Sequence, residues 1–589
     1  MFACFTRSLL VSAAVLAADS ASRGQFPAVL RAPELNGRNG FTLYGVQEAD
    51  IVGHEIAGAG DVNHDGYDDL LVGMRVSWDA LPPYWWCPPG TVYVLFGKPG
   101  LGRGGVLYTS SDDTTAGFFI EGLVQCDYLS AGLAGLGDFN GDGVDDIAIG
   151  AIKADVPAVG RTLAGVGYFI FGHEGIGESG RFDLATLNGS NGFVLWGAAT
   201  GDLTGWSVAS AGDFNNDGHP DLVLGAHGAD PYGMGAAGRA YIIYGGPGVG
   251  SSGVIDLATL DASQGLVING TASPNWTGFD VAYAGQVNGD DVDDIIISAQ
   301  HASPGGRYRA GQAYVVFGGV SKGRATLDLW DLDGTNGFTL NGVLAGDESG
   351  WQVGGASDLN GDSFADVLVG SNEIPTGYVS FGGTKVGSGG QVELSDLDGT
   401  TGFAVTSQSI YQTVAGGFDL NTDGVQDCVL GDQLASFGGG RGSAHILLGG
   451  DLPGWAVFDL TLLNGRNGFR FDGPPFDESM TGGALAACGD LNGDGLDDLA
   501  IGAAWATPPQ TRVERAGAVY VIFGRRLGDF DLDADVDLAD FLIFQQCFAG
   551  SDNPPGVGCP TDVVSDLDYD GDVDLADFLI FQQNFTGSR

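Results

Sequence analysis

One pattern of apolar and polar positions recurs along most of this chain. Short apolar runs such as YVLFG (93–97), YFIFG (168–172) and YVIFG (520–524) combine β-branched and aromatic residues and end in glycine. Such runs predict buried β-strands. Another apolar run, of the type DLLVGM (69–74), precedes each of them, and one of the type NGFTLYG (39–45) recurs beside them. Together with the segment that leads into DLLVGM, each repeat unit predicts about four strands.

A polar loop of the pattern D-x-N-x-D-G-x-x-D marks the period of this repetition. Its seven copies start at Asp61, Asp138, Asp213, Gln286, Asp358, Asp419 and Asp490. Seven units of about four strands predict an all-β fold, a seven-bladed β-propeller of four-stranded blades. An open solenoid of seven sheets is the alternative.

The order of the strands along the chain indicates how the ring closes. A run of the NGFTLYG type follows the third strand of each unit as an outer strand, but no copy follows Gly524. The first copy, Phe41–Gly45, instead precedes every other strand. We therefore expect Phe41–Gly45 to complete the seventh blade and join the chain ends, which removes an exposed sheet edge. The propeller would span 39–524, after a lead-in at 21–38.

The N-terminus is typical of a secretory signal peptide at 1–20. Arg7 is followed by the ten-residue apolar run LLVSAAVLAA (9–18), which is too short to cross a bilayer. An N-terminal core helix is the alternative. Export predicts a secreted, extracellular or cell-surface-associated protein in an oxidising, calcium-rich compartment, although the periplasm is another destination. No later stretch is long enough to be a transmembrane segment.

Six cysteines remain after the signal peptide: Cys87, Cys126, Cys428, Cys488, Cys547 and Cys559. We favour a Cys547–Cys559 bridge, because the two lie close together in a Pro/Gly-rich connector. Cys87–Cys126 is a second candidate, while Cys428 and Cys488 lie beside strand cores and are candidates for free, buried thiols.

Charge narrows the choice of partners. The chain carries 74 acidic and 24 basic side chains, for a formal net charge of -50. Such a surface repels nucleic acid and anionic lipid and attracts multivalent cations. We therefore expect no nucleic-acid partner.

Calcium explains why so many acids are placed in the repeated loops. Ca²⁺ takes six to eight oxygen ligands, and a glycine in such a loop permits the sharp turn. The predicted ligand side chains are Asp61, Asn63, Asp65 and Asp69; Asp138, Asn140, Asp142 and Asp146; Asp213, Asn215, Asp217 and Asp221; Asn288, Asp290 and Asp294; Asp358, Asn360, Asp362 and Asp366; Asp419, Asn421, Asp423 and Asp427; and Asp490, Asn492, Asp494 and Asp498. Polar turns without metal are the alternative.

Two of the seven loops depart from the pattern. The fourth begins with Gln286 and has Asp291 at the glycine position, and the fifth has Ser363 there. The fourth site is therefore predicted to be the weakest or to be empty.

The repeated unit resembles the FG-GAP repeat of integrin α-chain propellers and their bacterial relatives. TGWSVASAGD (204–213) matches the first half of that repeat and LVLGAH (222–227) matches its end, and the resemblance covers about 39–524. It implies calcium in hairpin loops on one face of the propeller and ligand-binding loops on the other face.

The segment after the propeller, 525–589, contains two further acidic loops of 12 residues. DFDLDADVDLAD (529–540) and DLDYDGDVDLAD (566–577) carry acids at positions 1, 3, 5, 7, 9 and 12, which is EF-hand spacing, and each runs into a helix-like apolar segment. The predicted ligands are Asp529, Asp531, Asp533, Asp535, Asp537 and Asp540, and Asp566, Asp568, Asp570, Asp572, Asp574 and Asp577. Gly571 suits the turn of the second loop, whereas Ala534 replaces it in the first. A solvated acidic run is the alternative.

Two loop–helix halves near a C-terminus resemble a type I dockerin, a small α-helical calcium module that docks into a cohesin. In dockerins, loop positions 10 and 11 contact the partner, which implies partner-binding roles for Leu538, Ala539, Leu575 and Ala576. The Pro-rich spacer that includes 551–560 departs from short dockerin linkers. The resemblance therefore implies a cohesin-like protein as the partner, and the departure leaves another surface protein as the alternative.

A dense aromatic group lies in the loop 76–90. Its members are Trp78, Tyr84, Trp85 and Trp86, and aromatic rings in a loop suit sugar stacking or protein anchoring. A local cap packed over the blade is the alternative.

No catalytic constellation stands out, because neither a zinc-protease, a nucleophile-elbow nor a phosphate-loop motif occurs. We therefore expect a secreted adhesion or recognition protein with up to nine Ca²⁺ ions. Its propeller would bind a protein or glycan, and its tail would tether it to a surface or an extracellular assembly. The alternatives are a polysaccharide-degrading enzyme, a carbohydrate-binding component of a cellulosome-like complex, and a passive spacer.

Overall fold

The computed structural model describes residues 26–587 apart from 75–87, 111–113, 320–322, 407–411, 436–441, 451, 453, 476–478, 552, 554, 557, 561–564 and 568–571. Several sequence predictions fall outside the described residues. These are the signal peptide 1–20, the start of the lead-in at 21–25, Cys87, the aromatic residues Trp78, Tyr84, Trp85 and Trp86, the acids Asp568 and Asp570, and the loop glycine Gly571.

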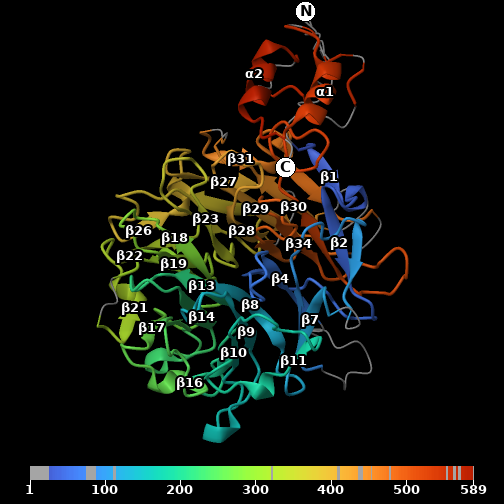
Figure 1. Cartoon of the computed structure of the whole chain (residues 1–589). Coiled ribbons are helices and arrows are strands. Elements are labelled where there is room, and N and C mark those ends of the chain that lie inside the picture. Colours follow the sequence, from blue (N-terminus) through green and yellow to red (C-terminus); the bar gives the residue numbers. More distant parts are fainter. Residues whose placement is uncertain are drawn as a thin grey trace, which may run out of the picture.

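Seven β-sheets are arranged around a common axis, so the predicted seven-bladed propeller is confirmed. In Figure 1 the chain runs once around the ring, from blue through green and yellow to red. The innermost strands contact one another from blade to blade around the whole ring. They are β3 (Ile56–Gly60), β8 (Leu129–Gly137), β13 (Val208–Gly212), β18 (Val281–Gly285), β23 (Val353–Ser357), β28 (Gln412–Phe418) and β33 (Leu485–Ala487).

Each inner strand pairs with an antiparallel second strand, and that pairs with an antiparallel third strand. The second strands are β4 (Asp69–Met74), β9 (Asp146–Ala151), β14 (Asp221–Ala226), β19 (Asp294–Ala299), β24 (Asp366–Val369), β29 (Asp427–Asp432) and β34 (Leu499–Ala503). The third strands are β5 (Thr91–Leu95), β10 (Val166–Ile170), β15 (Arg239–Ile243), β20 (Gln312–Val316), β25 (Thr376–Ser380), β30 (Ser443–Leu447) and β35 (Ala518–Ile522).

The outer strands are the predicted GF runs: β7 (Gly117–Glu121), β12 (Gly192–Trp196), β17 (Gly265–Asn269), β22 (Gly337–Asn341), β27 (Gly402–Thr406), β32 (Gly468–Asp472) and β2 (Gly40–Tyr44). β2 pairs with β35 in the seventh blade, with Phe41 opposite Val521. The predicted closure of the ring by the N-terminal strand is therefore confirmed.

The prediction of four-stranded blades is wrong, because each sheet has a fifth strand. This short strand comes from another unit and runs parallel to the outer strand; Thr326, for example, lies opposite Val267. The fifth strands are β11 (Arg181–Phe182), β16 (Val254–Asp256), β21 (Thr326–Asp328), β26 (Gln391–Glu393), β31 (Val457–Asp459), β1 (Val29–Arg31) and β6 (Val106–Tyr108). An added strand gives the backbone groups on the outer edge of each blade their hydrogen-bond partners.

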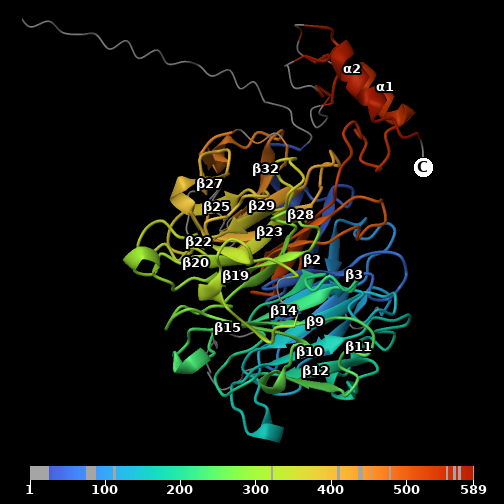
Figure 2. The same ribbon diagram turned by 90° about the vertical axis from the view of Figure 1, so that its left-hand side faces the viewer.

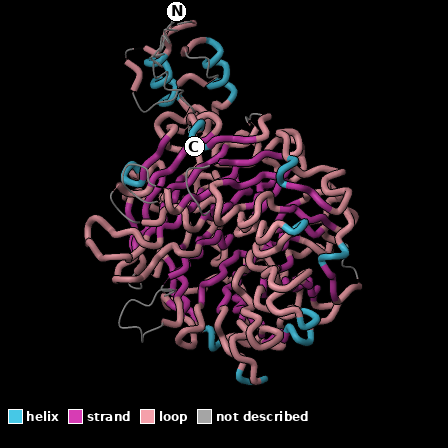
Figure 3. Tube along the Cα trace, turned by 180° about the vertical axis from the view of Figure 1, so that it is seen from behind, coloured by secondary structure: helices cyan, strands magenta, loops and turns pink. Residues whose placement is uncertain are grey.

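Short 3₁₀ turns follow six of these strands: η3 (Leu184–Thr186), η5 (Leu257–Thr259), η7 (Leu329–Asp331), η8 (Leu394–Asp396), η9 (Leu460–Leu462) and η1 (Ala32–Glu34). Three more turns each lie between the second and third strands of a single blade. They are η2 (Pro157–Val159) in blade 2, η4 (Pro231–Gly233) in blade 3 and η6 (Pro304–Gly306) in blade 4. Figure 3 shows the strands inside the molecule and the loops around them.

Apolar side chains of adjacent sheets interdigitate to form the core. Phe169 on β10 and Phe193 on β12, for example, stack with ring centroids 4.6 Å apart, and both are buried against Leu222 and Leu224 of the next blade. This packing explains why the strand runs are apolar on both faces, since each sheet is covered by a neighbour on both sides.

Two helices form a small module outside the ring, α1 (Leu538–Cys547) and α2 (Leu575–Gln583) (Figures 1 and 2). Phe544 and Phe581 meet with ring centroids 5.5 Å apart. On the propeller side, Arg38 donates from Nη1 to the carbonyl of Asp531 at 3.1 Å. Neither helix, nor any other among the described residues, is long and apolar enough to cross a membrane.

The cysteine predictions can be compared with the structure at five of the six positions. Cys547 and Cys559 form the predicted disulfide, and Cys428 and Cys488 are free and buried as expected. Cys126 is disulfide-bonded, but its predicted partner lies outside the described residues.

Candidate metal centres

The seven acidic loops connect the first and second strands of the blades, and the first carboxylate of the loop shapes the turn in most of them. In the first loop, Asp61 accepts hydrogen bonds from the backbone N–H of Asp65 at 2.9 Å and of Gly66 at 2.7 Å. The first carboxylate of the loop thus holds its own turn together through the N–H groups four and five residues further along. Asp213 makes the same two contacts in the third loop, and Asp490 in the seventh.

The two atypical loops keep this turn in spite of their substitutions. Asp291 has φ +65° and Ser363 has φ +73°, in the left-handed region where Gly66 lies at φ +92°. Non-glycine residues reach that region at a cost of about 1–2 kcal/mol. The fourth and fifth loops therefore have the same turn conformation at lower intrinsic stability.

The ninth residue of each loop is a buried carboxylate that links the loop to the rest of its blade. Asp69 accepts from the N–H of Val62 at 3.1 Å and from the N–H of Gly97 at 2.9 Å. Gly97 follows the third strand, and a Cβ there would lie 2.1 Å from a backbone oxygen. The glycine that ends each third-strand run is thus required by close packing.

The same contact to the glycine after the third strand recurs in every blade. It is made by Asp69, Asp146, Asp221, Asp294, Asp366, Asp427 and Asp498. We call these seven residues the clamp aspartates. Each carboxylate oxygen has a second lone pair, so clamping leaves these groups able to bind a cation as well.

Burial raises the pKa of the clamp aspartates, and neighbouring loop acids raise it further. The pKa of Asp69 rises from 3.8 to about 8, with burial as the main cause and repulsion by Asp65 and Asp61 adding to it. The pKa of Asp294 rises to about 7, and that of Asp498 rises well above its ordinary value. Without a cation, these carboxylates are costly to ionise.

This cost leads to a prediction about pH. The calcium-stripped protein is expected to lose stability as the pH rises from about 5 to about 8. In that range the folded chain holds protons on clamp aspartates that the unfolded chain, with pKa values near 3.8, has released. The free energy of unfolding therefore falls with rising pH. Melting curves after dialysis against a chelator measure this, and a melting temperature that rises over this range contradicts it.

The side chains around each loop fit a hard divalent cation. All predicted ligands are carboxylate or amide oxygens, the donors that Ca²⁺ and Mg²⁺ prefer. In the third loop, the Oδ1 atom of Asn215 is buried and receives no hydrogen bond. A cation in this loop would give the buried acceptor a partner, and Asn215 is one of the residues predicted to bind it.

A second set of acids, at loop position eight, was missed at the sequence level. Asp145 of blade 2 accepts from the N–H of Asp61 of blade 1 at 2.9 Å, and Asp68 accepts from Asp490 at 2.8 Å. Asp293 and Asp497 make the equivalent contacts to Asp213 and Asp419. These four acids connect the first predicted ligand of one loop to the neighbouring blade. The doublet DD at the end of a loop was the available signal.

In the C-terminal module the structure brings most of the predicted ligands together. One oxygen from each of Asp529, Asp531, Asp533 and Asp540 lies within 4.8 Å of the others, and the same holds for Asp535, Asp537 and Asp540, and for Asp572, Asp574 and Asp577. The Oδ1 atom of Asp531 is buried and accepts no hydrogen bond. Ala534, at the glycine position, adopts φ +71°, so the first loop makes its turn without glycine.

The helices of this module begin earlier than the apolar segments suggested. Asp537 caps α1 by accepting from the N–H of Ala539 at 2.6 Å, and Asp540 accepts from the N–H of Asp537 at 2.8 Å. The last two acids of the loop are therefore also the first turn of the helix. Leu538 is 68% exposed and Leu575 is 62% exposed, which leaves both predicted partner positions accessible.

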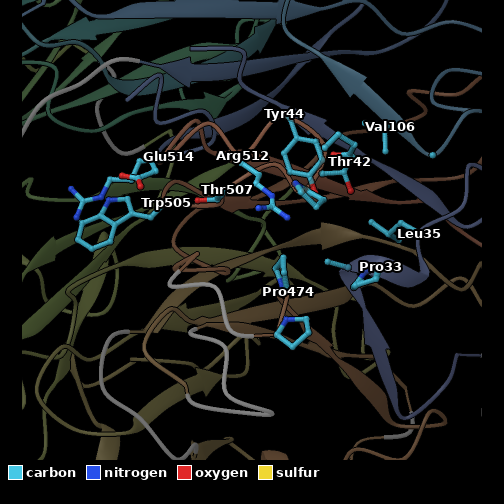
Figure 4. Close-up of a pocket in the computed structure, with 16 residues that line it drawn as sticks. Pro33, Leu35, Thr42, Tyr44, Val106, Pro474, Trp505, Thr507, Arg512 and Glu514 are labelled. Atoms are coloured by element: carbon cyan, nitrogen blue, oxygen red, sulfur yellow. The ribbon is translucent and has the colours of Figure 1, made fainter. Parts of the chain in front are cut away.

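A cavity of about 950 Å³ lies beside the seventh blade, and none of the residues that line it is a predicted metal ligand. It is lined by Trp505, Arg512 and Glu514 of the loop between β34 and β35, and by Tyr44 of β2 (Figure 4). Arg515 lies over the indole of Trp505, 4.6 Å from the ring centroid. The size suits a small molecule, although no sequence motif indicated this cavity.

Comparison with known proteins finds a repeat family and several relatives that match parts of the propeller. The FG-GAP repeat family matches residues 204–243 and 481–522, which contain the first three strands of blade 3 and of blade 7. The chain is 31% identical over 202 residues to integrin alpha-5 of Xenopus laevis, covering 33% of this chain and 17% of that protein.

A second relative is phosphatidylinositol-glycan-specific phospholipase D of Homo sapiens, 33% identical over 178 residues, covering 29% of this chain and 19% of that protein. The matches thus span less than a fifth of the length of these relatives. A crystal structure of BBS1N in complex with ARL6DN aligns with 82% of this chain at a TM-score of 0.41 and 9% identity. The chain carries FG-GAP repeats on a seven-bladed propeller similar to that of integrin α chains.

Proposed function

We propose that this chain is a secreted, calcium-binding recognition protein. Its propeller would bind an extracellular protein or glycan, and its C-terminal module would tether it to a cohesin-like or other surface protein. Up to nine Ca²⁺ ions would be held by the seven loops of the propeller and the two loops of the tail.

The observation that carries the proposal is the duplicated apolar surface beside the acidic clusters of the tail. Leu538 and Leu575 occupy the same position at the start of α1 and α2, and both are mostly exposed. Leu542 and Leu579, one turn further along each helix, are exposed as well. An exposed apolar surface that recurs at equivalent positions of two related helices supports a protein-binding role.

The test measures binding of the full chain to an immobilised type I cohesin domain. We expect binding in calcium, its loss in EGTA, and at least about a hundredfold weaker binding for the double variant Leu538→Asp/Leu575→Asp. Each single variant serves as a matched control, because the intact half can still face the partner.

A chain that fails to bind cohesin in calcium would exclude a cohesin as the partner. Equal binding by the double variant would exclude the helix starts as the contact surface. Fusion of residues 1–20 to a reporter tests export separately.

A polysaccharide-degrading enzyme or a carbohydrate-binding component remains the alternative function. Exposed aromatic side chains on the propeller favour the binding component. Hydrolysis of a polysaccharide by the purified chain would favour the enzyme. The similarity to a phospholipase is a reason to assay the hydrolysis of a glycolipid as well.

A further inference from the structure

Two aromatic side chains from distant parts of the chain meet on the outer part of blade 3. Tyr232, in η4, is 66% exposed, and Trp330, in η7, is 49% exposed. Their ring centroids are 5.6 Å apart and the ring planes are inclined by 38°. The pair therefore presents a broad, bent apolar surface to solvent.

The repeats show that the scaffold does not require these aromatics. At the position of Trp330, after the fifth strand, four other blades have Ala185, Ala258, Ser395 and Thr461. At the position of Tyr232, blade 4 has Gly305. Blade 3 thus carries two large exposed rings where related turns carry small residues.

The backbone at Tyr232 is strained in a way that blade 4 avoids. Tyr232 has φ +55° and ψ +20°, and Gly305 has φ +58° and ψ +20°. The turn is the same, but only glycine occupies this left-handed region freely, and a bulky residue there is an outlier. Blade 3 therefore keeps a tyrosine at a turn position that glycine fills without strain in blade 4.

The polar groups beneath the rings are also rearranged in blade 3. In blades 2 and 4 an arginine neutralises the acid that ends the fifth strand, as Arg161 does for Asp256 and Arg307 for Glu393, each at 2.6 Å. In blade 3 the acid is Asp328, and the Tyr232 hydroxyl lies 2.9 and 3.1 Å from its two oxygens. Asp328 thus receives a neutral donor in place of a cation.

Asp328, like Glu393 of blade 4, accepts from the asparagine that ends the outer strand and does not cap the turn that follows it, whereas three other counterparts do cap their turns. Those three are Asp183, Asp256 and Asp459. The Oδ1 atom of Asp328 accepts from Nδ2 of Asn269 at 2.9 Å. The carboxylate is therefore turned toward the aromatic pair, where its remaining lone pairs can accept hydroxyl protons.

We propose that Tyr232 and Trp330 form a stacking platform for a neutral oligosaccharide, with Asp328 accepting hydrogen bonds from its hydroxyl groups. The C–H face of a sugar ring packs on an aromatic face, and the polar rim of the sugar suits a carboxylate acceptor. The net charge of -50 disfavours acidic polysaccharides. This inference deepens the proposed recognition role of the propeller and rests on it for the function of the site.

The test uses the full chain and four neutral probes: cellohexaose, xylohexaose, mannohexaose and maltohexaose. Isothermal titration calorimetry is expected to show binding of at least one of them. Tyr232→Gly, which installs the residue that blade 4 uses, and Trp330→Ala, which installs that of blade 2, are each expected to weaken this binding by at least about tenfold. Tyr308→Ala is the matched control, because Tyr308 is 68% exposed on blade 4, and it should bind as wild type.

Stability separates loss of the platform from loss of the fold. Tyr232→Gly relieves strain and should melt no lower than wild type, and both variants should keep any effect of calcium on melting. No binding of the four sugars by wild type, or equal binding by Tyr232→Gly and Trp330→Ala, would overturn the platform and leave the calcium and tether proposals standing. If the chain binds a sugar but its melting temperature is the same with and without a chelator, only the calcium proposal is contradicted.

Discussion

Removal of bound calcium is expected to lower the melting temperature of the full chain by roughly 10–20 °C. Each site that is saturated at 100 times its Kd contributes about 2.7 kcal/mol to folding. Since folded proteins are stable by only about 5–15 kcal/mol, the loss of a few such sites removes most of that margin. The clamp aspartates would then be buried without a cation to neutralise them.

Differential scanning calorimetry in calcium, after chelation, and after calcium is restored measures this effect. Restored calcium should return the melting temperature to its starting value, which shows that chelation did not damage the chain. A melting temperature that is the same in all three samples would contradict a structural role for the metal.

Replacement of the clamp aspartate of the seventh blade is expected to have the second-largest effect. Asp498 is fully buried and accepts from the N–H groups of Leu491 and Gly524, each at 3.1 Å. Asp498→Ala leaves both donors without their acceptor, at about 1–3 kcal/mol each. We therefore expect a loss of roughly 2–6 kcal/mol in the blade that closes the ring.

Asp494→Asn is the matched control, because Asp494 is a predicted ligand of the same loop but does not hold the third strand. Asp494→Asn should lower the free energy of unfolding in calcium but not after chelation. Asp498→Ala should lower it in both conditions. Urea unfolding measures both. If the two variants lose stability equally in calcium and neither loses any after chelation, Asp498 acts only through the metal and the clamp is wrong.

The sequence predictions that the structure confirms rest on local patterns of residues. The glycine-ended third strands, the closing strand near Phe41 and the Cys547–Cys559 bridge all follow from residues close together in sequence or from a repeat that is seen seven times. The structure also explains why these glycines and acids repeat together, since the backbone N–H groups of Gly97 and its equivalents donate to the clamp aspartates.

The features that were missed depend on residues that are distant in sequence. The fifth strands are only two or three residues long, as with β11 at Arg181–Phe182, which is too short for a period to be visible. Asp145 acts on a loop that lies 84 positions away, and Tyr232 meets Trp330 only after both have been placed by blade 3. The helix starts were missed because acids at Asp537 and Asp540 looked like loop ligands and also cap the helix.

The account depends most on the claim that divalent cations neutralise the clustered acids of the loops. The most direct test is the metal content of the purified full chain, measured by mass spectrometry after equilibration in millimolar calcium and removal of free ions. We expect Ca²⁺ in several-fold molar excess over the chain, approaching nine per chain if every predicted loop is filled. A chain that holds fewer than one Ca²⁺ or other divalent ion per molecule would contradict the account.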